Sequence, residues 1–139
     1  NPLTSPWMPL AAGARYIACD VYSDLTAFLA SALHLLGCDG VGLWIDLLAE
    51  VPAEPVQVAL LMKALPCLEQ LEPVAAHSLL DSLPAEHLLV SFPAHSLGGA
   101  RRGMPVNYEV HFRELLTGKP WHVRRYLWSS ELVFRVDKS

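Results

Sequence analysis

The sequence predicts an α/β fold with a mostly parallel sheet that ends in an antiparallel hairpin. Continuous apolar runs, such as VQVALLM at 56–62 and HLLVSF at 87–92, alternate with segments that suit helices. Such runs are typical of strands buried on both faces, which occur mainly in parallel sheets. The last two runs, at 121–127 and 131–136, are joined by a turn too short for a helical crossover, so we expect them to be antiparallel.

The composition indicates one globular domain over residues 1–139. The chain has 139 residues, of which 53% are apolar and 17% are charged. No apolar run is long enough to predict a membrane span. The three cysteines form no CxxC pair and the six histidines show no HxxxH or HxH spacing, so we expect neither a disulfide scaffold nor a metal site. This cysteine usage indicates a reducing cytoplasm.

Apolar runs predict six strands in chain order. They lie at 16–19, 41–45, 56–62, 87–92, 121–127 and 131–136. Three helices are expected between them, and the first shows the 3.6-residue period of an amphipathic helix. These helices lie at 23–36, 73–83 and 105–116. We expect Ser23 to be the N-cap of the first helix and Gly37 to end it, and Pro73 suits the first turn of the second.

Acidic residues follow the first two predicted strands. Ligands of open parallel sheets bind at the carboxyl ends of the strands, where the sequence has Asp20, Asp46, residues 63–66 and residues 91–93. A carboxylate can accept two hydrogen bonds from a vicinal diol, so Asp20 suits a ribose, and Asp46 suits the exocyclic amine of an adenine. A helix N-cap or a solvated loop carboxylate is the alternative interpretation of each aspartate.

Positive charge is concentrated at the end of the chain. Residues 1–99 contain two basic and ten acidic side chains, whereas residues 100–139 contain eight basic and four acidic ones. We therefore expect a surface that faces a polyanion around Arg101, Arg102, Arg124 and Arg125. Ordinary solvated charge is the alternative explanation. The sequence has no GxSxG elbow and no P-loop pattern, which argues against serine hydrolases and nucleotide hydrolysis.

Four segments of the chain follow the pattern of a known family. They are CDVYSDL at 19–25, ALLMKALPCLEQ at 59–70, VSFPAHSLGGARRGM at 90–104 with NYEVHF just after it, and SSELVFRV at 129–136. Together they resemble the aminoglycoside-resistance methyltransferases that methylate N7 of a guanosine in the decoding region of 16S ribosomal RNA. The resemblance runs from Asn1 to Val136, and SFP…SLGG…GM followed by NY is its most specific part.

This resemblance implies a Rossmann-like class I methyltransferase fold, S-adenosylmethionine as cofactor and the 30S ribosomal subunit as substrate. It implies a set of cofactor-binding residues and a set of RNA-binding residues. The cofactor set is Asn1, Pro2, Asp20, Asp46, Leu47, Leu61, Lys63 and Leu65. The RNA set is Ser96, Arg101, Arg102, Met104 and Asn107. No residue is expected to act as a catalytic base, and no metal is expected.

The chain departs from the family pattern in two places. Only Asn1, Pro2 and Leu3 represent the glycine-rich cofactor loop, so we expect the first strand and an upstream RNA-binding domain to be absent from this chain. In the family's strand order, 3-2-1-4-5-7-6, the absent strand is central. We expect its place to be filled by an N-terminal fragment, by a second copy, or by direct pairing of the flanking strands. Ala100 also stands where the family tends to have a basic residue.

Two further functions are alternatives to the methyltransferase. One is a non-catalytic RNA- or protein-binding remnant of the same fold, which would lack the glycine-rich loop. The other is a nicotinamide-dependent oxidoreductase, which would share the diol-binding acid. The second is weaker because the SFPAHSLGG segment has no role in it.

Overall fold

The computed structural model describes residues 2–94 and 104–138. The chain forms two compact units, Asn1–Val51 and Pro52–Ser139. Asn1 and residues 95–103, which include Ser96, Arg101 and Arg102, lie outside the described residues. Within the described part, no helix is both long and apolar enough to cross a bilayer.

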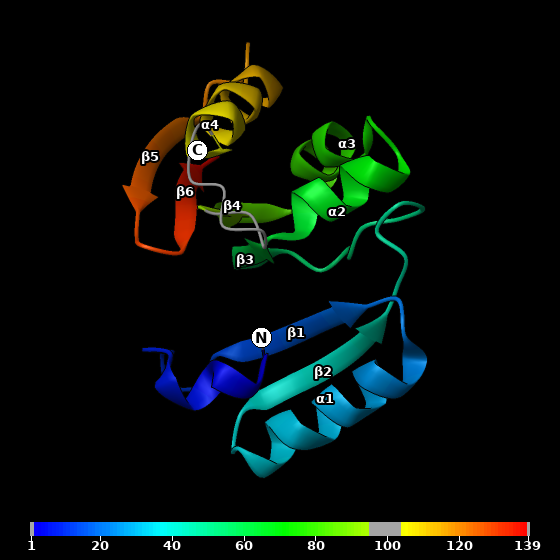
Figure 1. Ribbon diagram of the computed structural model, residues 1–139. Coiled ribbons are helices and arrows are strands. Elements are labelled where there is room, and N and C mark those ends of the chain that lie inside the picture. Colours follow the sequence, from blue (N-terminus) through cyan, green and yellow to red (C-terminus); the bar gives the residue numbers. More distant parts are fainter. Residues whose placement is uncertain (1, 95–103, 139) are drawn as a thin grey trace. The chain divides into compact units, whose positions relative to one another are not determined.

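The first unit is a two-stranded parallel sheet with a helix packed on it (Figure 1). Its elements are the 3-10 helix η1 (Pro2–Trp7), β1 (Arg15–Asp20), α1 (Ser23–Leu35) and β2 (Asp39–Trp44). The two strands pair in register from Arg15↔Asp39 to Asp20↔Trp44. Ala18 of β1 and the α1 residues Leu29 and Leu33 form the core, because helical spacing puts both leucines on the face toward the sheet.

Local chemistry sets the two ends of α1. Gly37 has a φ of 71°, a left-handed conformation that glycine adopts without strain, which confirms the predicted stop. The predicted N-cap was wrong, because Tyr22 is the N-cap and Ser23 is already helical. The carboxylate of Asp20 accepts the backbone N–H of Tyr22 at 3.0 Å, which turns the chain into the helix without a capping side chain from Ser23.

Glycine in β2 allows α1 to approach the sheet closely. A Cβ built on Gly42 would lie 2.0 Å from the backbone oxygen of Thr26, in the first part of α1. A Cβ on Gly40 would lie 2.6 Å from the side chain of Leu33. The helix therefore rests on a strip of β2 that carries no side chains, and Thr26, although polar, is buried there.

The second unit is a four-stranded sheet with helices on one face (Figure 1). Its elements are β3 (Val56–Met62), α2 (Ala64–Leu71), α3 (Ala75–Ser82), β4 (Ala85–Pro93), α4 (Met104–Leu115), β5 (His122–Leu127) and β6 (Glu131–Asp137). The strand order is β3-β4-β6-β5. β3 is parallel to β4, whereas β6 is antiparallel to both β4 and β5, as predicted for the closing hairpin.

Aromatic side chains form the core of the second unit. Alternation along the strands turns Phe92 of β4 and Phe134 of β6 toward Phe112 of α4. The rings of Phe112 and Phe134 are stacked with centroids 4.7 Å apart, and Phe92 contacts both edge-on. All three phenylalanines are fully buried, so they fix α4 over β4 and β6.

One helix was not predicted. The expected helix at 73–83 corresponds to α3, but α2 precedes it at Ala64–Leu71. Pro66 occupies the first turn of α2, where proline is tolerated because its missing N–H has no helical acceptor. Leu65 of α2 is fully buried and holds the helix in the core.

The two sheets correspond to two parts of the methyltransferase strand order. The order β2-β1 matches the positions 3-2, and β3-β4-β6-β5 matches 4-5-7-6. In the described part of the chain no strand pairs with the second edge of β1 or with the second edge of β3. β1 and β3 belong to separate sheets, and which of the three expectations fills the central position stays a prediction.

Candidate functional site

The two predicted ligand-binding aspartates lie at one edge of the first sheet. Asp20 ends β1 and pairs with Trp44 at the end of β2, and Asp46 follows two residues later. Because the strands are parallel, both carboxylates lie at the carboxyl edge, where ligands of such sheets bind. The side-chain bond from Trp44 Nε1 to the carbonyl oxygen of Val21, at 2.9 Å, ties the two strand ends together. Trp44 was not among the residues predicted to lie at this site.

Each aspartate combines a structural bond with a free oxygen. Asp20 Oδ1 accepts the N–H of Tyr22 at 3.0 Å, and Asp46 Oδ1 accepts the N–H of Leu48 at 2.9 Å. Within the described residues neither Oδ2 has a partner. The loop interpretation and the ligand interpretation are thus compatible, because one oxygen shapes the loop and the other can accept a hydrogen bond. Leu47, which directly follows Asp46, is half-buried.

In the second unit, Lys63 organises the carboxyl edge of the sheet. It has a φ of 58°, a left-handed conformation that is uncommon for residues other than glycine. Its backbone N–H donates to both the carbonyl oxygen (3.0 Å) and the hydroxyl oxygen (3.1 Å) of Ser91 in β4. Its Nζ lies 2.7 Å from Glu131 Oε1 in β6. Lys63 thus joins the ends of three strands.

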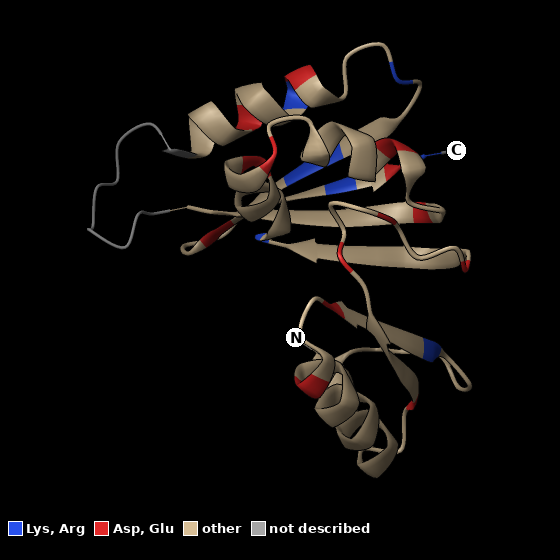
Figure 2. Cartoon of the chain, turned by 90° about the vertical axis from the view of Figure 1, so that its right-hand side faces the viewer, with Lys and Arg blue, Asp and Glu red and all other residues tan. Residues whose placement is uncertain are grey.

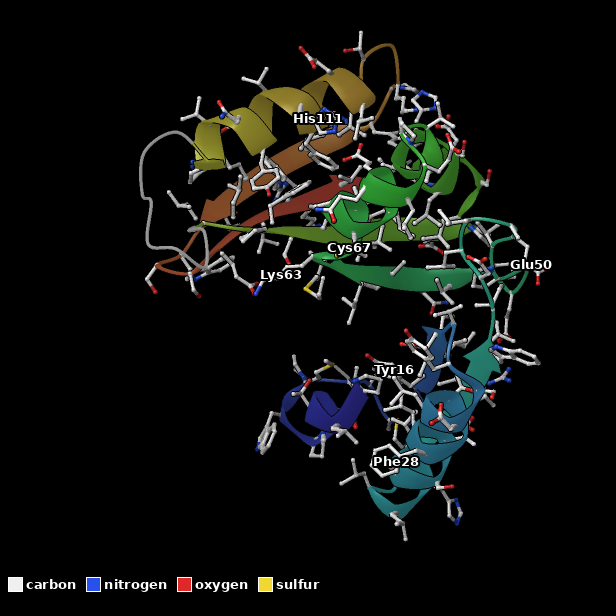
Figure 3. The ribbon with its side chains drawn as sticks, turned by 45° about the vertical axis from the view of Figure 1, so that its right-hand side comes forward. Tyr16, Phe28, Glu50, Lys63, Cys67 and His111 are labelled. Atoms are coloured by element: carbon white, nitrogen blue, oxygen red, sulfur yellow. The ribbon has the colours of Figure 1, made fainter. Side chains whose placement is uncertain are left out.

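The remaining strand-end residues present backbone rather than side chains. Leu61 of β3 is 6% exposed and Leu65 of α2 is fully buried, so these two residues can contact a ligand mainly through their main chain. Figure 3 shows Lys63 and Cys67 side by side where β3 passes into α2. The Cys67 thiol lies 3.5 Å from the carbonyl oxygen of Lys63, as expected for a residue one turn further along the helix.

The β5–β6 hairpin turn lies at the same edge of the second sheet. Pro93, the last residue of β4, pairs with Glu131, the first residue of β6. The N–H of Ala94 then donates to the carbonyl oxygen of Ser130 in the turn, at 3.0 Å. Ala94, the last described residue before the segment 95–103, therefore lies beside this turn. The described residues resume at Met104, where α4 begins, and Asn107 is exposed on that helix.

The basic residues of the second unit fall into paired and unpaired groups. Figure 2 shows how few Lys and Arg residues the first unit has compared with the second. Arg125 of β5 donates to Glu109 Oε2 at 2.7 Å, and Arg113 donates to Glu109 Oε1 at 2.9 Å. Hydrogen bonding from Arg113, and then from Arg125, lowers the pKa of the Glu109 carboxyl. Arg124 is exposed, and the described part of the chain offers it no acidic partner.

Strand alternation explains the difference between the two neighbouring arginines. Arg125 pairs with Phe134 in the ladder and so shares the face that α4 covers. Arg124 pairs with Arg135 and points to the opposite face. We predicted that Arg124 and Arg125 share one surface that faces a polyanion, but their side chains lie on different faces of the hairpin.

A second cationic group lies at the opposite end of this sheet. Lys119 and Lys138 place their Nζ atoms 5.0 and 4.8 Å from the centre of the Trp121 ring. Lys119 forms an ion pair with Asp81, and Lys138 donates to the carbonyl oxygen of Leu83 at 2.7 Å. Burial lowers the pKa of Lys138. These cations are engaged by the protein itself, so they close the amino end of the sheet rather than offer a ligand site.

Sequence comparisons connect the chain with rRNA methyltransferases. The family model described as "Ribosomal RNA methyltransferase (FmrO)" matches residues 1–135. The 16S rRNA (guanine(1405)-N(7))-methyltransferase of Micromonospora echinospora is 33% identical over 138 residues, which cover 99% of this chain and 50% of that protein. The enzyme of the same name from Serratia marcescens is 33% identical over 135 residues, which cover 94% and 54%. The chain thus spans about half the length of these relatives.

Solved structures show the same likeness. The 16S rRNA methyltransferase RmtF, in complex with S-adenosyl-L-homocysteine, matches with a TM-score of 0.81 and 31% identity, over 98% of this chain and 59% of that one. The 16S rRNA methylase RmtB matches with a TM-score of 0.73 and 26% identity, over 88% and 46%. These matches confirm the predicted Rossmann-like methyltransferase fold.

Proposed function

We propose that this chain, which belongs to the ribosomal RNA methyltransferase (FmrO) family, forms the cofactor-binding part of an enzyme that methylates N7 of a guanosine in 16S rRNA. The single observation that carries the proposal is the family match over residues 1–135. Its relatives are named for that reaction, and RmtF was crystallised with the demethylated cofactor. The 30S subunit is then the substrate, the bacterial cytoplasm the compartment, and aminoglycoside resistance the consequence.

The strand-end residues suit S-adenosylmethionine. Asp20 has a carboxylate oxygen without a partner in the described part of the chain, at the carboxyl edge where a ribose diol would bind. Asp46 lies at the same edge and suits the adenine amine. We further propose that Leu47, Leu61, Lys63 and Leu65 line the cofactor, together with Asn1 and Pro2, and that Ser96, Arg101, Arg102, Met104 and Asn107 meet the RNA. The cofactor supplies an electrophilic methyl group on a positively charged sulfur.

The chemistry needs no catalytic base. N7 of neutral guanine has a free lone pair, so attack on the methyl group requires no prior deprotonation. The protein's contribution is to hold the two reactants in line, which is worth roughly 7–11 kcal/mol in well-oriented reactions. Among the described residues proposed to meet the cofactor, the ionisable side chains are Asp20, Asp46 and Lys63, and Lys63 is held by Glu131. No histidine or cysteine needs a proton-transfer role.

We also propose that a further strand completes the sheet between β1 and β3. Each of these strands has one edge without a ladder partner in the described residues, and open edges are prone to pair with another strand. The family's strand order puts a strand at this position. The match covers 50% of the M. echinospora enzyme, so we propose that the rest of such a protein supplies this strand; a strand from a second copy is the alternative.

A fusion tests both proposals. The chain is prepared in two forms, alone and joined to the part of the M. echinospora enzyme that the match does not cover. We expect the fusion to bind S-adenosylmethionine and, after incubation with 30S subunits, to make one 16S rRNA guanosine cleavable by borohydride and aniline, because these reagents cleave RNA at N7-methylguanosine and not at guanosine. We expect the chain alone to do neither, and its mass in solution to show whether a second copy fills the gap.

The outcomes separate the candidate functions. Methylation by the fusion supports the enzyme and the added strand together. If a monomer of the chain alone binds cofactor with the affinity of the fusion, the added strand is wrong. If the fusion binds 30S subunits but never cofactor, the non-catalytic remnant is favoured. Bound nicotinamide in place of S-adenosylmethionine, identified by mass spectrometry, would favour the oxidoreductase.

A further inference from the structure

Two aromatic side chains are exposed at the tip of the β5–β6 hairpin. Trp128 is 57% exposed and Tyr126 is 39% exposed. Their rings are stacked with centroids 5.8 Å apart and planes inclined by 18°. The stack keeps the two rings in fixed relative positions, so little side-chain freedom remains to be lost when a third planar group binds.

The hairpin tip lies at the functional edge of its sheet. Glu131, three residues after Trp128, forms the ion pair with Lys63, and Ser130 accepts the N–H of Ala94. The N–H of Trp128 donates to the carbonyl oxygen of Glu131 at 2.8 Å, which closes the turn. The aromatic pair is thus built into the same set of bonds that joins β3, β4 and β6 at their predicted ligand-binding ends.

Arg124 supplies a positive charge on the same face. It lies two residues before Tyr126 in β5, so alternation turns both side chains to the face opposite α4. Arg125, one residue away, is neutralised by Glu109. Arg124 is exposed, and the described part of the chain gives it no ion pair, which leaves its guanidinium available to an anion.

We propose that Tyr126 and Trp128 form a stacking platform for an unpaired base of the rRNA substrate, with Arg124 on the adjoining phosphate. Unpaired bases stack on aromatic side chains, and arginine binds phosphate through a planar fork of donors. A second copy pairing along β5 is a poorer occupant, because charged residues such as Arg124 and Arg125 on an edge strand disfavour strand addition. This inference rests on the proposed function, since it assigns a contact to the same substrate.

The platform is tested by measuring the affinity for 30S subunits of the form of the protein that methylates them. Trp128→Ala should weaken binding by about 5- to 150-fold, the range for the loss of one base–aromatic stack, and should leave the salt dependence unchanged. Trp128→Phe should retain most of the affinity. Arg124→Ala should reduce the salt slope by about 0.7–0.9, because one phosphate contact is lost. Trp7→Ala, which removes a tryptophan that is 81% exposed in the first unit, is the matched control and should bind normally.

Three results would overturn the inference. The first is unchanged affinity of both Trp128→Ala and Tyr126→Ala. The second is ultraviolet crosslinking of the hairpin peptide to a ribosomal protein rather than to RNA. The third is failure of the unmutated protein to bind or methylate 30S subunits, which would refute the proposed function as well. Circular dichroism and cofactor affinity of each variant show that the fold is intact, so a loss of binding is assigned to the platform.

Discussion

The backbone N–H of Lys63 points at two oxygens of Ser91, the carbonyl at 3.0 Å and the hydroxyl at 3.1 Å. This bond crosses from the end of β3 to the end of β4 at the point where Lys63 takes its left-handed conformation. Ser91 is fully buried, so its hydroxyl has no water to replace Lys63. The polar side chain of a central strand thus holds the turn that leads from β3 into α2.

Ser91→Ala should lower the free energy of unfolding by about 0.5–1.5 kcal/mol, the net value of one hydrogen bond. The carbonyl acceptor remains, so the N–H of Lys63 is not left without a partner and the loss stays modest. Urea unfolding measures the change, with Ser78→Ala, on the exposed side of α3, as the control. A stability equal to wild type would mean that the hydroxyl only fills space.

Gly42→Ala should destabilise the first unit more than Gly40→Ala does. The new methyl group at Gly42 meets the backbone oxygen of Thr26 at 2.0 Å, and the backbone of a packed helix cannot move aside without shifting the helix. At Gly40 it meets the side chain of Leu33, with Cδ1 at 2.6 Å, which a change of rotamer can move, and Cβ at 2.9 Å, which only a small shift of the helix can relieve. Overpacking typically costs about 1–3 kcal/mol, and we expect Gly42→Ala at or above the top of that range.

Thermal unfolding of both variants checks this order, with the first unit followed by the fluorescence of Trp44. Equal stability of the two alanine variants would show that α1 shifts freely on the sheet. A larger loss at Gly40 would show that the packing of Leu33, rather than the backbone of Thr26, limits the approach of the helix.

Glu109→Gln should lower stability at neutral pH and have no effect in acid. Arg113, and then Arg125, hold the pKa of Glu109 below its unfolded value, so the folded state favours the carboxylate. A group with a depressed folded pKa contributes stability that is fully present above its unfolded pKa of about 4.3 and is lost as the pH falls through the folded pKa. Because the pairs are partly exposed, we expect each to contribute about 0.2–1 kcal/mol.

Urea unfolding at a series of pH values tests this sign. The difference between wild type and Glu109→Gln should be constant from neutral pH down to about pH 5 and should shrink below it. Glu114→Gln, on the same helix and exposed, is the control and should show little difference at any pH. A difference that grows as the pH falls would contradict the assignment.

The sequence predicted most of the fold, because apolar runs and their stops are local signals. The run at 56–62 coincides with β3, and Gly37 ends α1 as expected. The helix α2 was missed because Pro66 is a breaker in a helix interior but not in a first turn. Ser23 was wrongly predicted as the N-cap because Asp20 makes the turn into α1. We had interpreted Asp20 first as a ligand-binding residue.

The sequence predicted the candidate site only where a residue with a characteristic side chain directly follows a buried strand. Asp20 and Asp46 meet that condition, since a carboxylate after a buried strand is visible in the sequence. Contacts between distant segments, such as Lys63 with Glu131, depend on which strands pair and carry no local signal. The separation of Arg124 from Arg125 follows from the ladder register, which the sequence leaves open.

Asp20→Ala should weaken binding of S-adenosylmethionine by about 1–3 kcal/mol, the scale for a hydrogen bond to a charged group. The substitution removes the carboxylate proposed to accept the ribose hydroxyls, and it also removes the bond to the N–H of Tyr22. Asp20→Asn separates these effects, because an amide oxygen still accepts from Tyr22 but can accept only one of the two hydroxyls.

Asp24→Ala, an exposed acid in the first turn of α1, is the charge-matched control. Calorimetry, on the form of the protein that binds cofactor, measures the affinity for S-adenosylmethionine. We expect Asp24→Ala to bind as tightly as wild type, Asp20→Asn to bind more weakly, and Asp20→Ala to bind most weakly. An affinity for S-adenosylmethionine that is unchanged in Asp20→Ala would refute the ribose assignment. If the alanine and asparagine variants lose the same affinity, the cofactor requires the second acceptor oxygen of Asp20 rather than the turn at Tyr22.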